Sequence, residues 1–435
     1  MQTSKLDARS SKLKLNRLLA RYGALAAFAA AIPAVAYLVV QPGPAERFRP
    51  LFMAERPGSA AVRADLGPAG PLGPTEAEHV TTPAFVKGIY VSADTAAAKR
   101  RFAQLVDLVD RTELNAMVID VKDGRGALAF APESEALKPF ASERPQLGEL
   151  RAFTGPLHEK GIYLIARVFV FQDPWLVSKK PEYAVQRLGG GVWRDRRGTP
   201  WMDPASRDVW KYNAAVAKEV YAAGFDEVQF DYIRFLSDGN LSTAVYPAYD
   251  RTTPKSEVIA SFFGYMDAEL REKHGIPISA DLFGLTMDQH EYDLGIGQRL
   301  EPAARHFDFV SPMVYPSHYA SGYQGFANPA AHPYEVARHS IMAGWPVLDA
   351  LKAEDDALRE RSPGLSLRIG TIRPWLQDFD LGAHYTAEMV RGQMKAAIEG
   401  KASGWLFWNA KNVYTEAAYA PAGEEGDTVE KINAE

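Results

Sequence analysis

Acidic residues stand where three apolar segments of the sequence end. Asp120 closes the segment AMVID, Asp231 closes EVQFD, and Asp281 follows PISA. A strand that is buried on both faces should be apolar throughout, so a carboxylate near its end needs a functional or structural reason. Two carboxylates in one cleft with unequal surroundings differ in pKa, and can then act as acid and base or as acid and nucleophile. Hydrolysis of a glycosidic bond needs such a pair, about 5 to 9.5 Å apart.

Other polar residues and aromatic residues accompany these carboxylates. Every second residue of a strand shares a face, so Gln229 should point the same way as Asp231, and Ser279 the same way as Asp281. We predict Asp231 as nucleophile or base and Asp281 as proton donor. Aromatic faces pack against sugar rings, which adds tryptophan and tyrosine to the candidates. The residues predicted to contact substrate are Asp120, Lys122, Arg167, Gln229, Tyr232, Arg234, Tyr315, His318, Arg373, Trp375 and Trp408.

Each candidate also has a structural interpretation. Asp231 as a buried ion-pair partner of Arg167 or Arg234 competes with catalysis, and so does Asp120 as a partner of Lys122 or Arg167. Trp405 and Trp408 lie three residues apart, so they should face opposite sides of one strand, with Trp408 at the rim. Glu227, at the start of its strand, is interpreted as a charge at the bottom face or in solvent.

The elements that must position these residues follow from the apolar pattern. Short apolar segments bounded by turns predict strands, and longer amphipathic segments predict helices. The predicted strands are Val86–Ala93, Ala116–Asp123, Ile162–Phe171, Glu227–Phe235, Pro277–Leu285, Phe307–Tyr315, Leu365–Ile372 and Gly404–Asn409. The predicted helices are Thr95–Glu113, Gln146–Lys160, Pro204–Ala223, Lys255–Lys273, Pro333–Gly344 and Thr386–Glu399.

Strands that alternate with helices indicate a parallel sheet with right-handed crossovers. Eight such units favour a closed (β/α)₈ TIM barrel over residues 85–415. An open doubly wound sheet is the alternative, but no G-x-G-x-x-G or P-loop pattern follows the first strand. In such a barrel the carboxyl ends of the strands meet at one mouth, where the carboxylates would converge.

Composition narrows the chemistry. The 435 residues include no cysteine, which excludes disulfides, thiolate metal sites and cysteine nucleophiles. No H-E-x-x-H pattern is present among the nine histidines, so we predict neither a metal site nor a cofactor. The net charge is −5, which argues against nucleic acid as a partner.

The N-terminal region predicts attachment to a membrane. Residues 1–21 form a basic region with a charge of +5, and residues 22–40 form a charge-free segment of 19 residues. A helix of that length nearly crosses the hydrocarbon core, and the preceding positive charges keep the N-terminus inside. We predict a single-pass anchor in the bacterial inner membrane with the barrel on the extracytoplasmic side. The alternative is a signal peptide cleaved after Ala34-Val35-Ala36, which would give a secreted protein.

Flanking segments complete the domain plan. Residues 41–84 are rich in proline and glycine and are predicted to be a flexible linker. Residues 416–435 are predicted to be a polar C-terminal tail. Without residues 1–40 the net charge is −10, so an anionic polymer would not be held by bulk charge.

Five segments in this order resemble a known family: GIYVSA, FDEVQFDYIRF, PISADLFG, SPMVYPSHY and GWLFWN. The family is the "putative glycoside hydrolase domain" family of unknown function, a set of secreted or membrane-anchored bacterial barrels akin to α-amylase-like enzymes. The resemblance covers residues 85–415. It implies a (β/α)₈ barrel that acts on a polysaccharide or oligosaccharide.

The resemblance also bears on single residues. The nucleophile of the α-amylase-like relatives is an aspartate at the end of strand four, which Asp231 matches. Their strand-five acid is a glutamate, and Asp281 is the nearest residue here. Their strand-seven aspartate has no counterpart, and the arginine two residues before their nucleophile is Gln229 here.

These observations predict hydrolysis of an extracytoplasmic polysaccharide by a two-carboxylate mechanism. One alternative is an inactive barrel that binds glycan and has a scaffolding role in the cell envelope. Ion pairs from the carboxylates to Arg167 and Lys122 would favour that alternative. The other alternative is a TIM-barrel enzyme with a different reaction.

Overall fold

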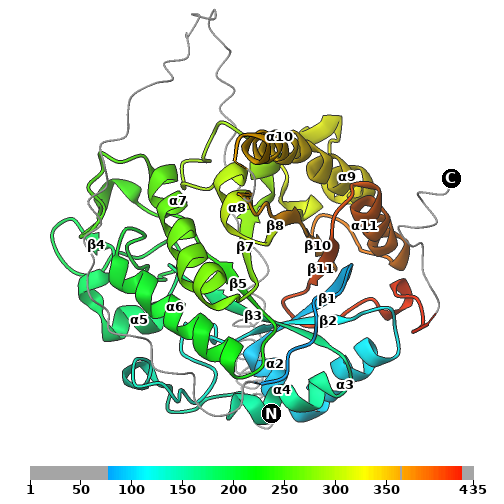
Figure 1. The fold of residues 1–435 in the computed structure, drawn as a ribbon, viewed down its shortest axis with the longest axis horizontal. Coiled ribbons are helices and arrows are strands. Elements are labelled where there is room, and N and C mark those ends of the chain that lie inside the picture. Colours follow the sequence, from blue (N-terminus) through cyan, green and yellow to red (C-terminus); the bar gives the residue numbers. More distant parts are fainter. Residues whose placement is uncertain (1–76, 363–364, 424–435) are drawn as a thin grey trace, which may run out of the picture.

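The strands form one closed parallel barrel (Figure 1). The computed structural model describes residues 77–362 and 365–423. Neighbouring strands pair in parallel around the barrel, and β10 closes the circle by pairing with both β8 and β11. The barrel strands are β1 (Val86–Val91), β2 (Ala116–Asp120), β3 (Tyr163–Phe169), β5 (Glu227–Asp231), β7 (Ile278–Phe283), β8 (Phe309–Met313), β9 (Thr371–Ile372), β10 (Trp375–Gln377) and β11 (Gly404–Trp408). β9 and β10 are separated by two residues and both pair with β8, so together they occupy one of eight positions around the barrel. The predicted (β/α)₈ barrel is confirmed.

Helices surround the barrel on its outside (Figure 1). They are α2 (Ala93–Ala97), α3 (Lys99–Asp110), α4 (Leu150–His158), α5 (Pro174–Lys179), α6 (Arg207–Ala222), α7 (Lys255–Met266), α8 (Leu300–His306), α9 (Pro333–Ala343), α10 (Trp345–Arg361) and α11 (Ala387–Glu399). The sequence analysis missed α5, α8 and α10. The predicted helix that begins at Pro204 starts too early, because α6 begins at Arg207, after Ser206. Asp203, just before the predicted start, accepts hydrogen bonds from the backbone of Ala205 and Ala248.

All eight predicted strands are shorter in the structure, and two of them change for a clear local reason. The predicted strand Leu365–Ile372 is reduced to β9, and β10 follows after Pro374, whose missing N–H prevents one continuous strand. The predicted strand Glu227–Phe235 ends at Asp231. Tyr232 has a φ of 54°, in the left-handed region that an extended strand cannot contain.

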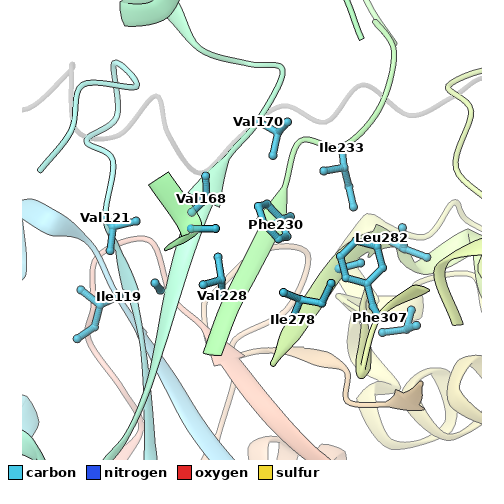
Figure 2. Packing of buried hydrophobic residues seen from close by; sticks show 14 of the residues in the cluster. Ile119, Val121, Val168, Val170, Val228, Phe230, Ile233, Ile278, Leu282 and Phe307 are labelled. Atoms are coloured by element: carbon cyan, nitrogen blue, oxygen red, sulfur yellow. The ribbon is translucent and has the colours of Figure 1, made fainter. Parts of the chain in front are cut away.

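Side chains alternate between two hydrophobic layers. Residues such as Val228 and Phe230 point outward and pack beneath the helices (Figure 2). A second cluster fills the barrel interior and includes Val118, Ile165 and Leu406. Because the period is two, the residues between the outward-facing ones, such as Asp231, point into the barrel.

A short antiparallel pair, β4 (Gln186–Arg187) with β6 (Ala244–Val245), lies outside the barrel sheet. It joins the long connections that follow β3 and β5. Connections after strands lie at the carboxyl ends of the barrel, so this pair lies on the same side as the mouth. The sequence analysis did not predict it.

Both predicted domain boundaries differ from the structure. Residues 77–84, assigned to the linker, contact the barrel: Val80 N donates to Asp226 at 2.8 Å, and the Thr82 and Tyr163 hydroxyls lie 3.1 Å apart. At the other end, Tyr419 was assigned to the polar tail, but its side chain is buried against Trp405.

The predicted basic region 1–21, the membrane segment 22–40 and linker residues 41–76 lie outside the described residues. Among the residues that are described, no helix combines the length and the apolar character needed to cross a membrane.

An ion pair fills the lower part of the barrel. Arg373 donates from both Nη atoms to Glu227, with Nη1 3.0 Å from Oε2, and both side chains are fully buried. Tyr163 and Ser279 donate to the same carboxylate. Glu227 is the first residue of β5, so the pair lies at the opposite end of this strand from Asp231. Glu227 is therefore at the bottom, as expected, but it is enclosed in protein.

Removal of one partner of this pair should destabilise the fold. We expect Glu227→Gln to lower the free energy of unfolding by about 3–5 kcal/mol, because the Arg373 charge stays buried without a partner. Urea unfolding measures this loss. Glu301→Gln is the matched control, since Glu301 pairs with Arg305 near the surface, and it should cost about 0–1 kcal/mol. Equal stability of the two variants would contradict the structural role of the pair.

Candidate active site

Arg167 gathers three aspartates at the carboxyl end of the barrel. Its Nη1 lies 2.9 Å from Asp120 Oδ1, its Nη2 donates to Asp231 Oδ2, and its Nε lies 3.6 Å from Asp281 Oδ2. The aspartates come from β2, β5 and β7, and Arg167 comes from β3. The predicted convergence of carboxylates from separate strands therefore occurs in the structure.

The spacing of Asp231 and Asp281 follows from this arrangement. Both carboxylates contact the same guanidinium group, so their separation stays below the roughly 9.5 Å upper limit for glycosidases. Three carboxylates around one guanidinium also leave an excess of negative charge. Like charges this close raise the pKa of at least one member.

Asp281 is the carboxylate most isolated from water. Its side chain is 1% exposed, Trp375 Nε1 donates to Oδ1 at 2.7 Å, and Oδ2 is buried without a hydrogen bond among the described residues. Burial, followed by the charge of Asp231, raises the pKa of Asp281 well above its ordinary value, although Arg167 opposes the shift. This environment favours the protonated acid.

Asp231 has different surroundings. Its Oδ2 accepts the hydrogen bond from Arg167, and its Oδ1 accepts one from the backbone N of Tyr232 at 2.5 Å. Both oxygens of this carboxylate therefore accept a hydrogen bond, one of them from a cation. The left-handed φ of Tyr232 turns the chain just after β5. Asp231 therefore suits the role of a base or nucleophile, beside an acid that holds its proton.

Asp120 is held between Arg167 and Tyr90. The Tyr90 hydroxyl donates to Asp120 Oδ2 at 2.5 Å. Burial raises the pKa of Asp120 to about 6, although the Arg167 charge and both hydrogen bonds lower it. The sequence analysis missed Tyr90. The signal was present, because Tyr90 shares the inner face of its strand with Gly88, and a polar hydroxyl there needs a partner.

Aromatic rings border the carboxylates. Trp408 stacks on Tyr90 with ring centroids 4.0 Å apart, meets Trp375 edge-on at 5.9 Å, and lies 4.8 Å from the Arg167 guanidinium. Trp408 is partly exposed, whereas Trp405 is buried on the outer side of the barrel. Trp408 therefore lies at the rim, where the sequence analysis placed it.

Tyr315 and His318 lie on the loop after β8. No described residue forms a hydrogen bond with the Tyr315 hydroxyl, and this oxygen is not enclosed. His318 packs edge-on against Tyr315 and also contacts Phe379, which the sequence analysis did not select. Burial lowers the pKa of His318 to about 4, so its ring is neutral at neutral pH.

Tyr232 and Arg234 follow β5 at the same rim. The Tyr232 ring is partly exposed and contacts Phe169 and Trp201 edge-on. The Arg234 guanidinium lies over the rings of Trp201 and Phe283. Trp201 and Phe283 were not among the predicted site residues.

Three predicted substrate contacts are fully buried in protein. Lys122 is fully buried, where it pairs with Asp173 and donates to Phe169 O at 2.6 Å. Gln229 is fully buried and donates to Ser311 Oγ at 3.2 Å. Arg373 belongs to the lower ion pair. Each strand presents inward residues at several levels, and periodicity alone does not separate the mouth from the lower layers.

The described residues contain no group of three or more side chains arranged to hold a metal ion. The clustered aspartates are instead tied to Arg167, Tyr90 and Trp375.

The environment of Asp120 is open to direct titration. A ¹³C NMR titration of labelled aspartate should give Asp120 a midpoint near 6, and Tyr90→Phe should raise it further because a donor to the carboxylate is lost. Exposed Asp250, whose pKa is lowered to about 2 by backbone donors, serves as an internal control. The folded-state pKa exceeds the unfolded one, so this group reduces stability as pH rises from 3.8 to about 6. A midpoint below 4 for Asp120 would contradict the described burial.

Comparison with known proteins agrees with this geometry. A model of the family DUF4015, described as "Putative glycosyl hydrolase domain", matches residues 88–414. A search of curated proteins gives no match. A hypothetical protein from Ruminiclostridium thermocellum is 34% identical, with a TM-score of 0.40, over 44% of this chain and 96% of that chain. The glycoside hydrolase domain of PgaB (BpsB) from Bordetella bronchiseptica is 16% identical, with a TM-score of 0.51, over 75% of this chain and 94% of that chain, and shares the fold. Because the family model spans most of the barrel, the chain belongs to this glycosyl hydrolase domain family.

Proposed function

We propose that the protein hydrolyses glycosidic bonds in a polysaccharide or oligosaccharide, with Asp281 as acid and Asp231 as nucleophile or base. The observation that carries the proposal is the contrast between the two carboxyl groups on Arg167. Asp281 is buried and has a raised pKa, whereas Asp231 accepts hydrogen bonds from a guanidinium and a backbone N–H. Unequal surroundings of this kind assign acid and base roles.

The reaction follows from these two states. Asp281 transfers its proton to the glycosidic oxygen as the bond to the anomeric carbon breaks. Asp231 either attacks that carbon or removes a proton from the attacking water. Asp281 must turn from Trp375 towards the mouth when substrate enters, because its side chain is 1% exposed without substrate.

The rim supplies the sugar contacts in this proposal. Trp408 and Tyr232 present partly exposed rings, which suit the apolar face of a sugar. The accessible Tyr315 hydroxyl and the neutral His318 ring can exchange hydrogen bonds with sugar hydroxyls. Asp120 and Arg167 are charged groups that lie beneath these rim side chains.

A glycan-binding barrel without catalysis is the second candidate. Arg167 pairs with Asp120 and Asp231, and the Asp281 carboxyl is almost closed to solvent. If the carboxylates stay ion-paired and closed to solvent, the barrel would bind sugar at its aromatic rim and leave the glycosidic bond intact.

Loss of either carboxyl group separates the two candidates. Asp231→Asn and Asp281→Asn should each lower hydrolysis by at least about 100-fold, since each removes a group that reacts in the transition state. The measurement is product release from a panel of polysaccharides by the full-length protein. Asp208→Asn, an exposed residue of α6, is the matched control and should retain full activity.

Two results would overturn the catalytic assignment. Activity that survives both substitutions would place the chemistry elsewhere. Binding to a glycan without any product release from the wild-type protein would favour the second candidate.

We further propose that residues 22–40 anchor the protein in the bacterial inner membrane, with the barrel on the extracytoplasmic side. The proposal is based on the charge-free segment and the basic residues before it. If the segment is cleaved, the barrel is secreted. Either location gives access to polysaccharides outside the cytoplasm.

Protease added to intact spheroplasts tests this location. We expect the barrel of the full-length protein to be degraded, and a variant without residues 1–40 to stay protected inside the cell. Extraction of the membrane fraction distinguishes an anchor from a cleaved signal. An anchored protein stays in the membrane fraction at full length, whereas a cleaved protein is released and shorter. Protection of the full-length protein in intact spheroplasts would contradict the proposed orientation.

A further inference from the structure

Arg234 is a buried cation without an anionic partner. The residue is 8% exposed, and no carboxylate of the described residues forms an ion pair with it. Its Nη1 donates to Phe235 O and Ser237 Oγ, both at 3.0 Å. Burial lowers the pKa of Arg234, and the nearest carboxylates, Asp231 among them, only partly oppose this effect. Burial of a charge without a counter-charge is costly, so it needs a reason.

Two donors of this guanidinium have no partner in the part of the chain that the structure describes. Only Nη1 forms hydrogen bonds with described residues, and Nε and Nη2 are not among the completely enclosed side-chain atoms. The guanidinium carbon lies over the Trp201 ring at 4.7 Å and over the Phe283 ring at 5.0 Å. The Nε and Nη2 donors of an arginine are parallel, which is the geometry that binds an oxyanion.

The position of this arginine relates it to the candidate active site. Phe283 follows Asp281 by two residues on β7, so its side chain lies on the same face one step closer to the mouth. Arg234 follows Asp231 by three residues, just after the turn at Tyr232. The guanidinium therefore lies at the rim beside the two carboxyl groups assigned to catalysis.

More positive charge lies on the neighbouring loop. Arg194, Arg196 and Arg197 are exposed there, and Arg197 is close enough to affect the pKa of Tyr232. Asp195, the acidic residue between them, accepts hydrogen bonds from the Trp201 ring and from the backbone of Thr199. This basic rim contrasts with the body of the protein, whose net charge without residues 1–40 is −10.

We propose that Trp201, Tyr232, Arg234 and Phe283 form a subsite for an anionic substituent of the glycan, so that the substrate is an acidic polysaccharide. The subsite rests on the proposed function, because it assumes a sugar at the mouth. Carboxylate, sulfate and phosphate groups share the oxyanion chemistry that Arg234 recognises. The acidic body of the protein repels an anionic glycan, so the basic rim is the place where such a glycan binds.

A glycan array with carboxylated, sulfated, phosphorylated and neutral members tests the subsite. The probe is the full-length Asp231→Asn protein, which binds without turnover. We expect acidic glycans to bind best. A second substitution in this protein, Arg234→Met, should weaken their binding about 10- to 100-fold, the loss typical of a charged hydrogen-bonded pair. The class of acidic glycan that binds, whether carboxylated, sulfated or phosphorylated, identifies the anionic substituent. Higher salt should weaken binding more in the Arg234 protein than in Arg234→Met.

Two further variants guard against a trivial loss of fold. Arg207→Met removes a guanidinium that lies 3.8 Å from the Trp210 ring on α6, outside the barrel, and should leave binding unchanged. Arg234→Lys keeps the charge and the stem but loses the planar pair of donors, and should weaken binding several-fold. If Arg234→Met does not fold, an unchanged affinity of Arg234→Lys overturns the subsite.

The outcomes separate this inference from the proposed function. Preference for neutral glycans, with hydrolysis by the wild-type protein, overturns the subsite and leaves the hydrolase in place. Binding of acidic glycans that depends on Arg234, without hydrolysis, supports the subsite and overturns the hydrolase. Absence of binding to every glycan overturns both.

Discussion

The charge balance around Arg167 is the constraint on which the candidate site depends. One guanidinium contacts Asp120, Asp231 and Asp281, which come from three different strands. Parallel pairing places β3 between β2 and β5, so an arginine on β3 reaches carboxylates on both sides. A single positive charge cannot compensate three negative charges in a buried place. Burial is unequal among the three, and it raises the pKa of Asp281, the most buried of them, well above its ordinary value.

The barrel supports this arrangement in layers. Glu227 and Arg373 form a closed ion pair in the lower part, while the aspartates occupy the upper part. The lower pair has no access to solvent and fixes the strands. The upper group borders aromatic rings that are partly exposed, and only there can a ligand meet the charges. Arg234 adds to the same end of the barrel a positive charge that forms no ion pair with a carboxylate of the described residues.

Much of this architecture could be predicted from the sequence. Short apolar segments fixed the number and order of the strands, and period two indicated that Asp120, Asp231 and Asp281 share the interior. The pattern could not show which polar residues are enclosed by neighbouring segments, so Lys122, Gln229 and Arg373 were assigned to the mouth although they are fully buried. Tyr90 could have been found, because a hydroxyl on the inner face of its strand needs a partner. Phe283 looks like an ordinary core residue in the sequence, and its role depends on neighbours from other strands, which a single segment does not reveal.

Neutron diffraction from crystals at neutral pH tests the central claim most directly. The account predicts a deuteron on the Asp281 carboxyl group and none on Asp231, with Arg167 fully protonated between them. Two ionised carboxylates would contradict the account, and so would a deuteron on Asp231 beside an ionised Asp281. The assignment of acid and base would then have no physical basis.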